Sequence, residues 1–326
     1  MTRQVFEYHP VIGHRFIPNL KIRVKHETGG YLVKTNNLGF RANEDFVKEK
    51  LNKNTRRVLL FGDSYSAGDG VSNGKRFSNI LSSDIDNLEV YNFAMSATGT
   101  GQQYLIYQEF AKDIENDLVI IVVLAENIRR VNSAYKIFYN REGNKVTYQK
   151  PYYKLTAENE LAVFNIPPDK SPYNPKDLEK DSGNYTGKHQ KLRSIVNKMG
   201  MKDVVQKFTG FQPLPEYNSA SNPEWLLMKA ILTDWIKTIS SKVLLVPLPI
   251  YQYTEETSSA KKFQTRFKEL AQELDVYLHD PLEDFQKYSM EERRKFRFET
   301  DIHPTPFGHQ AIAKSIQPTI EKILKS

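Results

Sequence analysis

Short apolar runs alternate along the chain with segments in which apolar positions recur at helical spacing. The apolar runs are 58–61, 89–93, 118–124, 242–247 and 276–278. The segments with helical character are 77–85, 102–114, 225–240, 260–274 and 309–324. This alternation predicts an α/β fold, in which helices cover both faces of a parallel sheet. Ligands of such folds bind at the carboxyl ends of the strands.

Two stretches interrupt the alternation. Residues 1–55 are punctuated by glycines, with one strand expected at 31–33, and we interpret them as an N-terminal accessory segment. In residues 132–222 the pattern predicts short aromatic strands at 135–147, 149–155 and 161–166, with a turn at 140–144. A polar loop is expected at 167–187 and a helix at 188–209. Because the α/β pattern resumes afterwards, we predict one domain over 56–326 with an insertion at about 132–222.

The composition narrows the classes of function. The 326 residues include no cysteine, which excludes disulfides, thiolate catalysis and Cys-based zinc sites. The net charge of +7 comes from scattered basic residues, so we predict no nucleic-acid partner. The histidines outside the C-terminal motif have no partner at metal-ligand spacing, and the chain has no phosphate-binding glycine loop. We therefore predict neither a metal nor a cofactor.

The sequence also bears on location. Residues 1–10 lack the apolar core of a signal peptide, and the longest apolar run, 118–125, is too short to span a bilayer. We expect a cytoplasmic protein with no membrane span, or a periplasmic or secreted one if a leader has been removed. The sequence makes no prediction of the oligomeric state.

The first motif with chemical potential directly follows the first strand. Residues 61–68 read Phe-Gly-Asp-Ser-Tyr-Ser-Ala-Gly, which places Ser64 at a tight turn from a strand into a helix. A serine there is exposed at the sheet edge, and its backbone N–H lies at a helix N-terminus that stabilises negative charge. A hydrolase needs this to hold an oxyanion. The alternative is an ordinary turn in which Ser64 caps the helix.

A second motif lies near the C-terminus, where Asp301 and His303 are two residues apart. A serine nucleophile needs a base, and the base needs a carboxylate that orients it. Residues i and i+2 of an extended segment point to the same side, so the carboxylate can reach the imidazole. The alternative is a surface aspartate and a helix-capping histidine.

Two further motifs follow the second and third strands. Residues 92–99 read Asn-Phe-Ala-Met-Ser-Ala-Thr-Gly, whose small side chains let backbone N–H groups approach a ligand. Asn127 follows the third strand, where its amide can donate a hydrogen bond to an oxyanion. Each motif alone is more often structural than functional, but all four fall at strand ends in one compatible order.

In these motifs the chain resembles the SGNH hydrolases, the GDSL esterase/lipase superfamily. The resemblance covers the Gly-Asp-Ser block at 62–64, the block at 92–102, Asn127, and the terminal Asp301 and His303, and it extends to an Asn-Asn-Leu-Gly-Phe-Arg segment at 36–41. It implies Ser64 as nucleophile, His303 as base and Asp301 as its partner. It also implies an oxyanion hole formed by the Ser64 and Ala97 N–H groups and the Asn127 side chain. The implied fold is a flavodoxin-like α/β/α sandwich with about five parallel strands.

Three positions depart from the family pattern. Ala97 stands where the family has glycine, and Ile128 follows Asn127 where aspartate is common. The Asp–His spacing is two, where three is commoner. If Asp301 does not reach His303, then Glu299, Asp280 or a Ser–His dyad are the alternatives.

The resemblance leads to three hypotheses of function. The first is a serine esterase that removes a short acyl group, acetyl by analogy with bacterial members of the group, from a small molecule or glycan. The second is an acyltransferase that uses the same residues, and the third is a non-catalytic glycan-binding protein. We expect substrate contacts from four residues next to the motif positions: Asp63, Tyr65, Gly99 and Glu126. The aromatic residues Tyr152, Tyr153 and Trp225 could line a sugar-stacking wall, although packing is the favoured interpretation.

Overall fold

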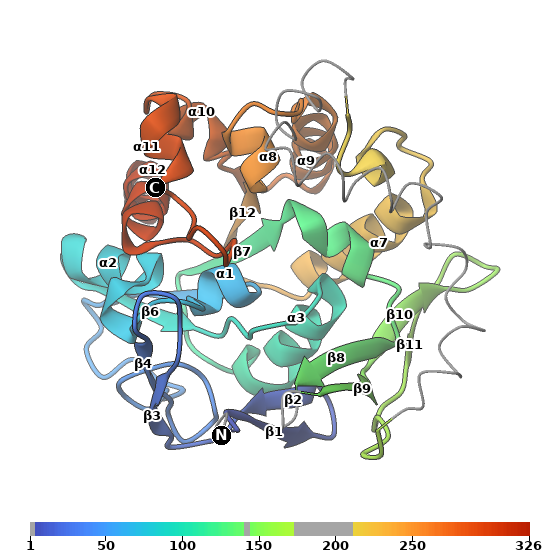
Figure 1. Cartoon of the computed structure of the whole chain (residues 1–326), viewed down its shortest axis with the longest axis horizontal. Helices are drawn as coiled ribbons and strands as arrows, with labels where there is room; N and C mark the ends of the chain where they lie inside the picture. Colours follow the sequence, from blue (N-terminus) through green and yellow to red (C-terminus); the bar gives the residue numbers. More distant parts are fainter. Residues whose placement is uncertain (1–3, 140–143, 173–210) are drawn as a thin grey trace.

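The centre of the protein is a sheet of five parallel strands in the order β13-β12-β7-β5-β6 (Figure 1). The computed structural model describes residues 4–139, 144–172 and 211–326. The central strands are β5 (Arg56–Phe61), β6 (Leu88–Asn92), β7 (Leu118–Leu124), β12 (Lys242–Leu248) and β13 (Tyr277–Leu278). All seven residues of β7 are buried, which explains why this run has no polar position.

The strand order reverses at β5. The chain passes from β5 to its neighbour β6 and then returns to β7 on the other side of β5. In a parallel sheet such a reversal leaves a crevice at the carboxyl ends of the strands, where ligands bind. The fold therefore places the expected site at the end of β5, which is the position of the Gly-Asp-Ser turn.

The long helices pack in two groups. α2 (Phe77–Asp84) packs with α12 (Pro306–Lys325), while α3 (Thr100–Ile106) and α9 (Lys261–Leu274) both contact α7 (Pro223–Lys237). Trp235 of α7 lies against the rings of Phe61 in β5 and Tyr104 in α3, which joins helix and sheet layers in one core. The predicted flavodoxin-like three-layer α/β/α sandwich is confirmed.

Short helical segments make the remaining connections. They are α1 (Ser64–Ala67), η1 (Asn73–Lys75), η2 (Tyr107–Ala111), η3 (Ala125–Arg130), η4 (Pro215–Tyr217), α8 (Tyr251–Thr254), α10 (Leu282–Phe285) and α11 (Met290–Arg294). The helix predicted at 102–114 begins earlier, at Thr100, and continues from Tyr107 as a single π-helical turn. The last helix begins at Pro306, because the Thr305 hydroxyl caps it by accepting from the Gly308 N–H.

The accessory segment contains more regular structure than expected. It forms two antiparallel hairpins, β1 (Phe6–His9) with β2 (Gly13–Phe16) and β3 (Lys21–Val24) with β4 (Tyr31–Lys34). Only β4 was expected, because it opens with three apolar or aromatic residues in a row, whereas the other three strands mix charged or polar with apolar positions.

The insertion also forms hairpins that lie outside the central sheet. They are β8 (Tyr135–Tyr139) with β9 (Lys145–Gln149), and β10 (Tyr152–Leu155) with β11 (Leu161–Phe164). The strand-like stretch expected at 135–147, with a turn signal at 140–144, contains β8 and the start of β9. The first N-terminal hairpin packs on the insertion, since Phe6 and His14 both contact the ring of Phe138 (Figure 1). The helix expected at 188–209 lies outside the described residues, as does most of the expected loop.

Candidate active site

Ser64 is the first residue of α1, directly after the turn that ends β5. A side chain at Gly62 would collide with the Ser66 hydroxyl, so only glycine allows the helix to start this close to the strand. The buried Asp63 caps the helix by accepting from the Tyr65 N–H at 3.1 Å. Ser64 therefore does not act as the cap.

The C-terminal motif lies beside this turn. His303 Nε2 is 2.8 Å from Ser64 Oγ, and His303 Nδ1 is 2.5 Å from Asp301 Oδ1. In the tautomer that fits both contacts, Nδ1 donates to the carboxylate and Nε2 accepts from the serine hydroxyl. The structure thus brings Ser64, His303 and Asp301 into one hydrogen-bonded chain, although serine and histidine are 239 positions apart.

The charges around His303 favour its protonated form. Burial lowers the pKa of His303, but the hydrogen bond to Asp301 and the negative charges of Asp69 and Asp63 outweigh it, so the pKa is raised. Burial likewise opposes ionisation of Asp301, yet its hydrogen bonds with His303 and His26 lower the pKa of Asp301 to about 2. Asp301 is therefore an anion throughout the neutral range and can stabilise an imidazolium.

The alternative acids have other surroundings. Asp280 accepts hydrogen bonds from the Gln264 side chain and the Leu282 N–H. Glu299 is exposed, and its N–H donates to Glu27. His309 is fully buried, and its Nδ1 accepts from the Phe77 N–H, so this histidine is structural.

The two other expected oxyanion positions follow the strands on either side of β5. Ala97 lies beyond β6 and has φ of 66°, the left-handed conformation that favours glycine. Asn127 lies in η3 directly beyond β7 and is fully buried. Both polar atoms of its amide lack a hydrogen-bond partner among the described residues. An unpartnered buried amide is costly in a purely structural role.

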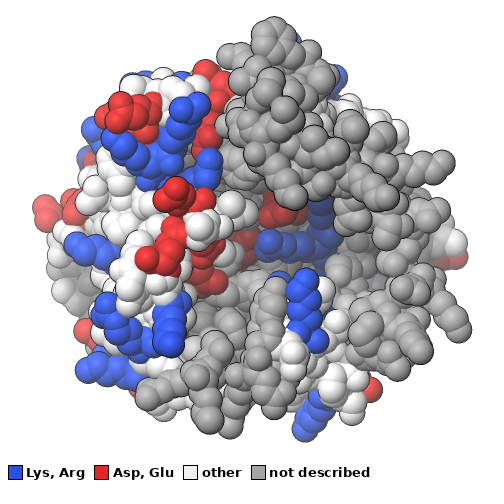
Figure 2. Space-filling view, in the orientation of Figure 1, with Lys and Arg blue, Asp and Glu red and all other residues white. Residues whose placement is uncertain are grey.

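Arg130 connects these segments and was not identified from the sequence. Its Nη1 donates to Asp63 Oδ2 at 3.2 Å and to the Thr98 carbonyl at 3.4 Å, and its Nη2 lies 3.5 Å from Glu126 Oε2. One side chain therefore joins the turn before Ser64, the loop of Ala97 and the helix of Asn127. The only sequence signal is the pair of arginines at the end of the Asn127 segment. Figure 2 shows basic and acidic side chains together in the central hollow of this face.

The four residues expected to contact the substrate differ in their exposure and in their partners. Asp63 is buried by its capping and Arg130 contacts, and the Tyr65 hydroxyl donates to the Ile302 carbonyl at 2.8 Å. Gly99 is buried against Arg130. These three residues have partners within the protein. Glu126, whose side chain is 40% exposed, is open to a ligand.

The proposed aromatic wall is not formed. Trp225 packs against Tyr217 and Phe267, and Tyr153 packs against Tyr104, and both are nearly fully buried. The favoured packing interpretation holds for these two rings. Tyr152 is partly exposed and stacks on Phe164 of the paired strand.

The upstream segment at 36–41 supports the nucleophile turn. Arg41, almost fully buried, donates to the carbonyls of Gly68 and Val71 and to the Asn73 side chain. Gly68 ends α1, so Arg41 fixes the C-terminal end of the helix whose first residue is Ser64. This contact gives the resemblance in the upstream segment a physical basis.

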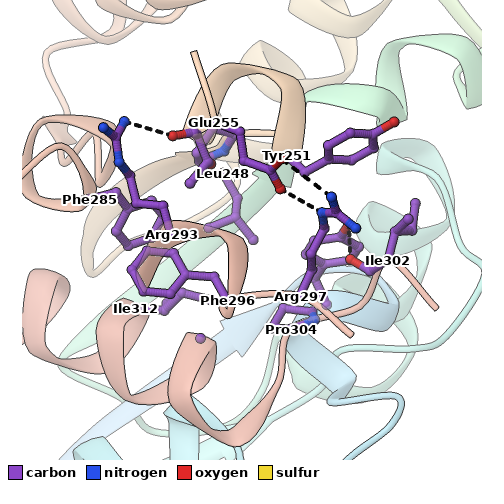
Figure 3. Close-up of a pocket in the computed structure, with 14 residues that line it drawn as sticks. Leu248, Tyr251, Glu255, Phe285, Arg293, Phe296, Arg297, Ile302, Pro304 and Ile312 are labelled. Atoms are coloured by element: carbon purple, nitrogen blue, oxygen red, sulfur yellow. Dashed lines mark hydrogen bonds and ion pairs between the residues drawn. The ribbon is translucent and has the colours of Figure 1, made fainter. Parts of the chain in front are cut away.

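A mainly apolar pocket lies beside the loop that carries His303, and it is lined by the flanking residues Ile302 and Pro304 (Figure 3). Tyr65, Ile302 and Pro304 form its wall nearest the site, and the Glu255–Arg297 ion pair, at 2.6 Å, crosses its rim. Neither Ser64, His303 nor Asn127 lines this pocket.

The described part of the chain holds neither a candidate metal site nor a candidate membrane-spanning helix. Within residues 4–139, 144–172 and 211–326, no three His, Asp or Glu side chains are grouped so that they could hold a metal ion. No helix in these ranges has the length and apolar character needed to cross a membrane.

The fold and the hydrogen-bonded chain define the class of an α/β serine hydrolase. Residues 58–316 match the family of GDSL-like Lipase/Acylhydrolase proteins, which is most of the chain, so the protein belongs to this family. It is an SGNH serine hydrolase that acts on ester substrates.

Three solved structures to which the chain is similar are distant in sequence. A member of the lipolytic G-D-S-L family from Veillonella parvula is 10% identical, with a TM-score of 0.45 and coverage of 82% of this chain and 100% of that one. The psychrotrophic esterase EstA from Pseudoalteromonas sp. is 13% identical, with a TM-score of 0.44 and coverage of 83% and 100%. LAE5, a hydrolase from the Lake Arreo metagenome, is 12% identical, with a TM-score of 0.46 and coverage of 82% and 96%. No curated protein matched the chain.

Proposed function

We propose that Ser64, His303 and Asp301 form the catalytic triad of an esterase that removes a short acyl group, acetyl, from a carbohydrate hydroxyl. The observation that carries the triad is the continuous chain from Ser64 Oγ through the imidazole to Asp301 Oδ1, with contacts of 2.8 and 2.5 Å. The 2.8 Å contact is within the range for a nucleophile and its base, and Asp301 lies close enough to the imidazole to orient it.

In the proposed reaction, Ser64 Oγ attacks the ester carbonyl carbon while His303 Nε2 accepts the hydroxyl proton. The N–H groups of Ser64 and Ala97 and the Asn127 amide stabilise the resulting oxyanion. The C–O bond then breaks, and the leaving alcohol takes the proton from His303. Water attacks the acyl-serine, His303 accepts a proton from that water, and the carboxylic acid leaves as Ser64 recovers its proton.

The surroundings of the triad support a polar alcohol. Arg130 and Glu126, whose side chains are partly exposed, lie at the nucleophile turn, and the partly exposed Asp69 accepts from the buried Ser96 hydroxyl at 2.6 Å. Such groups suit the hydroxyls of a sugar better than a long apolar chain, because polar groups that a lipid covered would lose their hydrogen bonds to water. The acetyl group itself rests on the resemblance to bacterial carbohydrate esterases.

The test is turnover of p-nitrophenyl acetate and of an acetylated sugar by Ser64→Ala. We expect kcat to fall by about 10⁴-fold or more, because the nucleophile is lost while the fold remains. Ser66→Ala is the matched control, since Ser66 lies in the same short helix and its buried hydroxyl has no partner among the described residues. Activity retained by Ser64→Ala would overturn the triad, and activity on the phenyl ester but not on the sugar would overturn the substrate class.

A further inference from the structure

Asp301 has a second histidine partner, from the N-terminal accessory segment. Its Oδ1 contacts His303, while its Oδ2 is 3.2 Å from His26 Nε2. The two contacts use both oxygens of one carboxylate. The His26 side chain is 8% exposed, whereas that of Asp301 is still 34% exposed with the histidine beside it.

His26 is itself held in place, in the turn that joins β3 to β4. Its ring lies edge-on to Phe298, with 4.4 Å between centroids, and also contacts Tyr31. Its Nδ1 is 3.2 Å from the Thr28 hydroxyl. A hydroxyl that donates to Nδ1 leaves the proton on Nε2, which is the tautomer needed to donate to Asp301.

The neighbouring Glu27 fixes the backbone that leads to Asp301. Its carboxylate accepts from the N–H groups of Glu299 and Thr300, both at 2.9 Å, and from the Thr300 hydroxyl. The β3–β4 turn therefore contacts the C-terminal loop both at its backbone and at the acid of the proposed triad. The accessory segment contributes to the site although it lies outside the matched family region.

We propose that His26 is a positioning residue, which holds the Asp301 carboxylate in the rotation that directs Oδ1 at His303. This inference rests on the proposed triad. An exposed carboxylate can rotate about its last bond and exchange its partners with water. A second donor on the far oxygen removes that freedom, and misplacement of about 1 Å near a reacting group can cost about 100-fold in rate.

The proposal is tested with His26→Ala and His26→Gln, assayed on p-nitrophenyl acetate across pH and by thermal unfolding. In His26→Ala we expect kcat to fall about 10- to 100-fold with KM unchanged. The acid limb of kcat/KM should move to lower pH, because Asp301 then supports the His303 imidazolium less well. Asp69 and Asp63, the other charges that act on His303, are unchanged. Glutamine can place an amide donor near Nε2, so His26→Gln should recover most of the loss.

His279→Ala is the matched control. His279 also tethers two segments, through the hydroxyls of Ser315 and Thr319, but it has no contact with the triad. We expect it to lower the thermal midpoint without moving the acid limb. The proposal is overturned if His26→Ala keeps the wild-type kcat and acid limb. It is also overturned if the kcat of His26→Gln is no higher than that of His26→Ala. An active Ser64→Ala would instead overturn the triad, whatever the His26 variants do.

Discussion

At the scale of single residues, Ala97 is the position where the proposed oxyanion hole departs from the family pattern. The family's glycine position carries an alanine with φ of 66°. An L-residue in this region costs about 1–2 kcal/mol, which the surrounding loop must offset. The proposed oxyanion donor is the Ala97 backbone N–H, so the side chain is free to vary as long as the chain keeps this conformation.

This conformation predicts the effect of two substitutions. Ala97→Gly should keep activity and raise the free energy of unfolding by about 0.5 kcal/mol, since the relief of strain exceeds the added freedom of the unfolded chain. Ala97→Val should lower both the activity and the free energy of unfolding, because β-branched residues resist positive φ. Denaturant unfolding and turnover of p-nitrophenyl acetate measure the two effects. A glycine variant less stable than the valine variant would contradict the left-handed backbone conformation at Ala97.

The residues of the site differ in how well the sequence predicts them. Asp301 and His303 are two positions apart, so local geometry alone makes their contact plausible, and Ser64, Ala97 and Asn127 each follow an apolar run. His26 is 275 positions from Asp301 and lies in a short, polar hairpin. Arg130 follows Asn127 closely, but its contact with Asp63 depends on how three loops converge. Contacts of this kind follow from the tertiary fold, which hydrophobic periodicity does not specify.

At the scale of elements, the central strands, the long helices and the strands of the insertion follow from the sequence pattern, and three of the four N-terminal hairpin strands do not. The run at β7 is wholly apolar because both faces of the sheet are covered, and this pattern is visible in the sequence. The strands of the accessory hairpins have four residues each, too few for alternation to stand out. The four-residue helix α1 is also too short to be stable alone, and its two ends are fixed by Asp63 and Arg41.

The support of α1 by Arg41 leads to a prediction for this element. Arg41→Lys keeps the charge but loses the planar fork that reaches Gly68, Val71 and Asn73 together. Buried carbonyls left without donors cost about 1–3 kcal/mol each, so the free energy of unfolding should fall by about 2–5 kcal/mol. Activity should fall as well, because the end of the Ser64 helix loosens.

The control for this variant is Arg294→Lys, at an exposed position in α11. It should change the free energy of unfolding by less than about 0.5 kcal/mol. Chemical denaturation of both variants, with kcat measured alongside, checks the prediction. Equal small effects at the two positions would show that Arg41 does not hold the helix.

At the scale of the whole molecule, two buried histidines connect the fold to pH. Burial lowers the pKa of His14 to about 4 and that of His309 to about 3. His14 Nε2 contacts the Ser96 carbonyl and thus the loop before Ala97, while His309 lies beneath α2 with Arg76 and Arg41 nearby. Both side chains stay neutral in the folded protein at pH values where the unfolded chain binds protons.

The sign of the pH dependence follows from this difference. The ordinary histidine pKa is about 6.5, so below that pH the unfolded state binds more protons than the folded state. The free energy of unfolding should therefore decrease as pH falls from about 6.5 toward 4, and the loss from these groups should level off below the folded pKa values. In His309→Gln, which cannot take up a proton, the decrease should be shallower. Urea unfolding at a series of pH values measures this decrease. If the free energy of unfolding of His309→Gln falls with pH as steeply as that of the wild-type protein, the contribution of His309 is refuted.

The central claim is that Ser64 is the nucleophile, and the most direct measurement is covalent labelling with a fluorophosphonate probe followed by peptide mapping. A serine activated by His303 should react, with the probe found on the peptide that contains Ser64, and Ser64→Ala should not be labelled. Ser66→Ala should be labelled like the wild-type protein. Absence of labelling in the folded wild-type chain, or a label on another serine, would contradict the account.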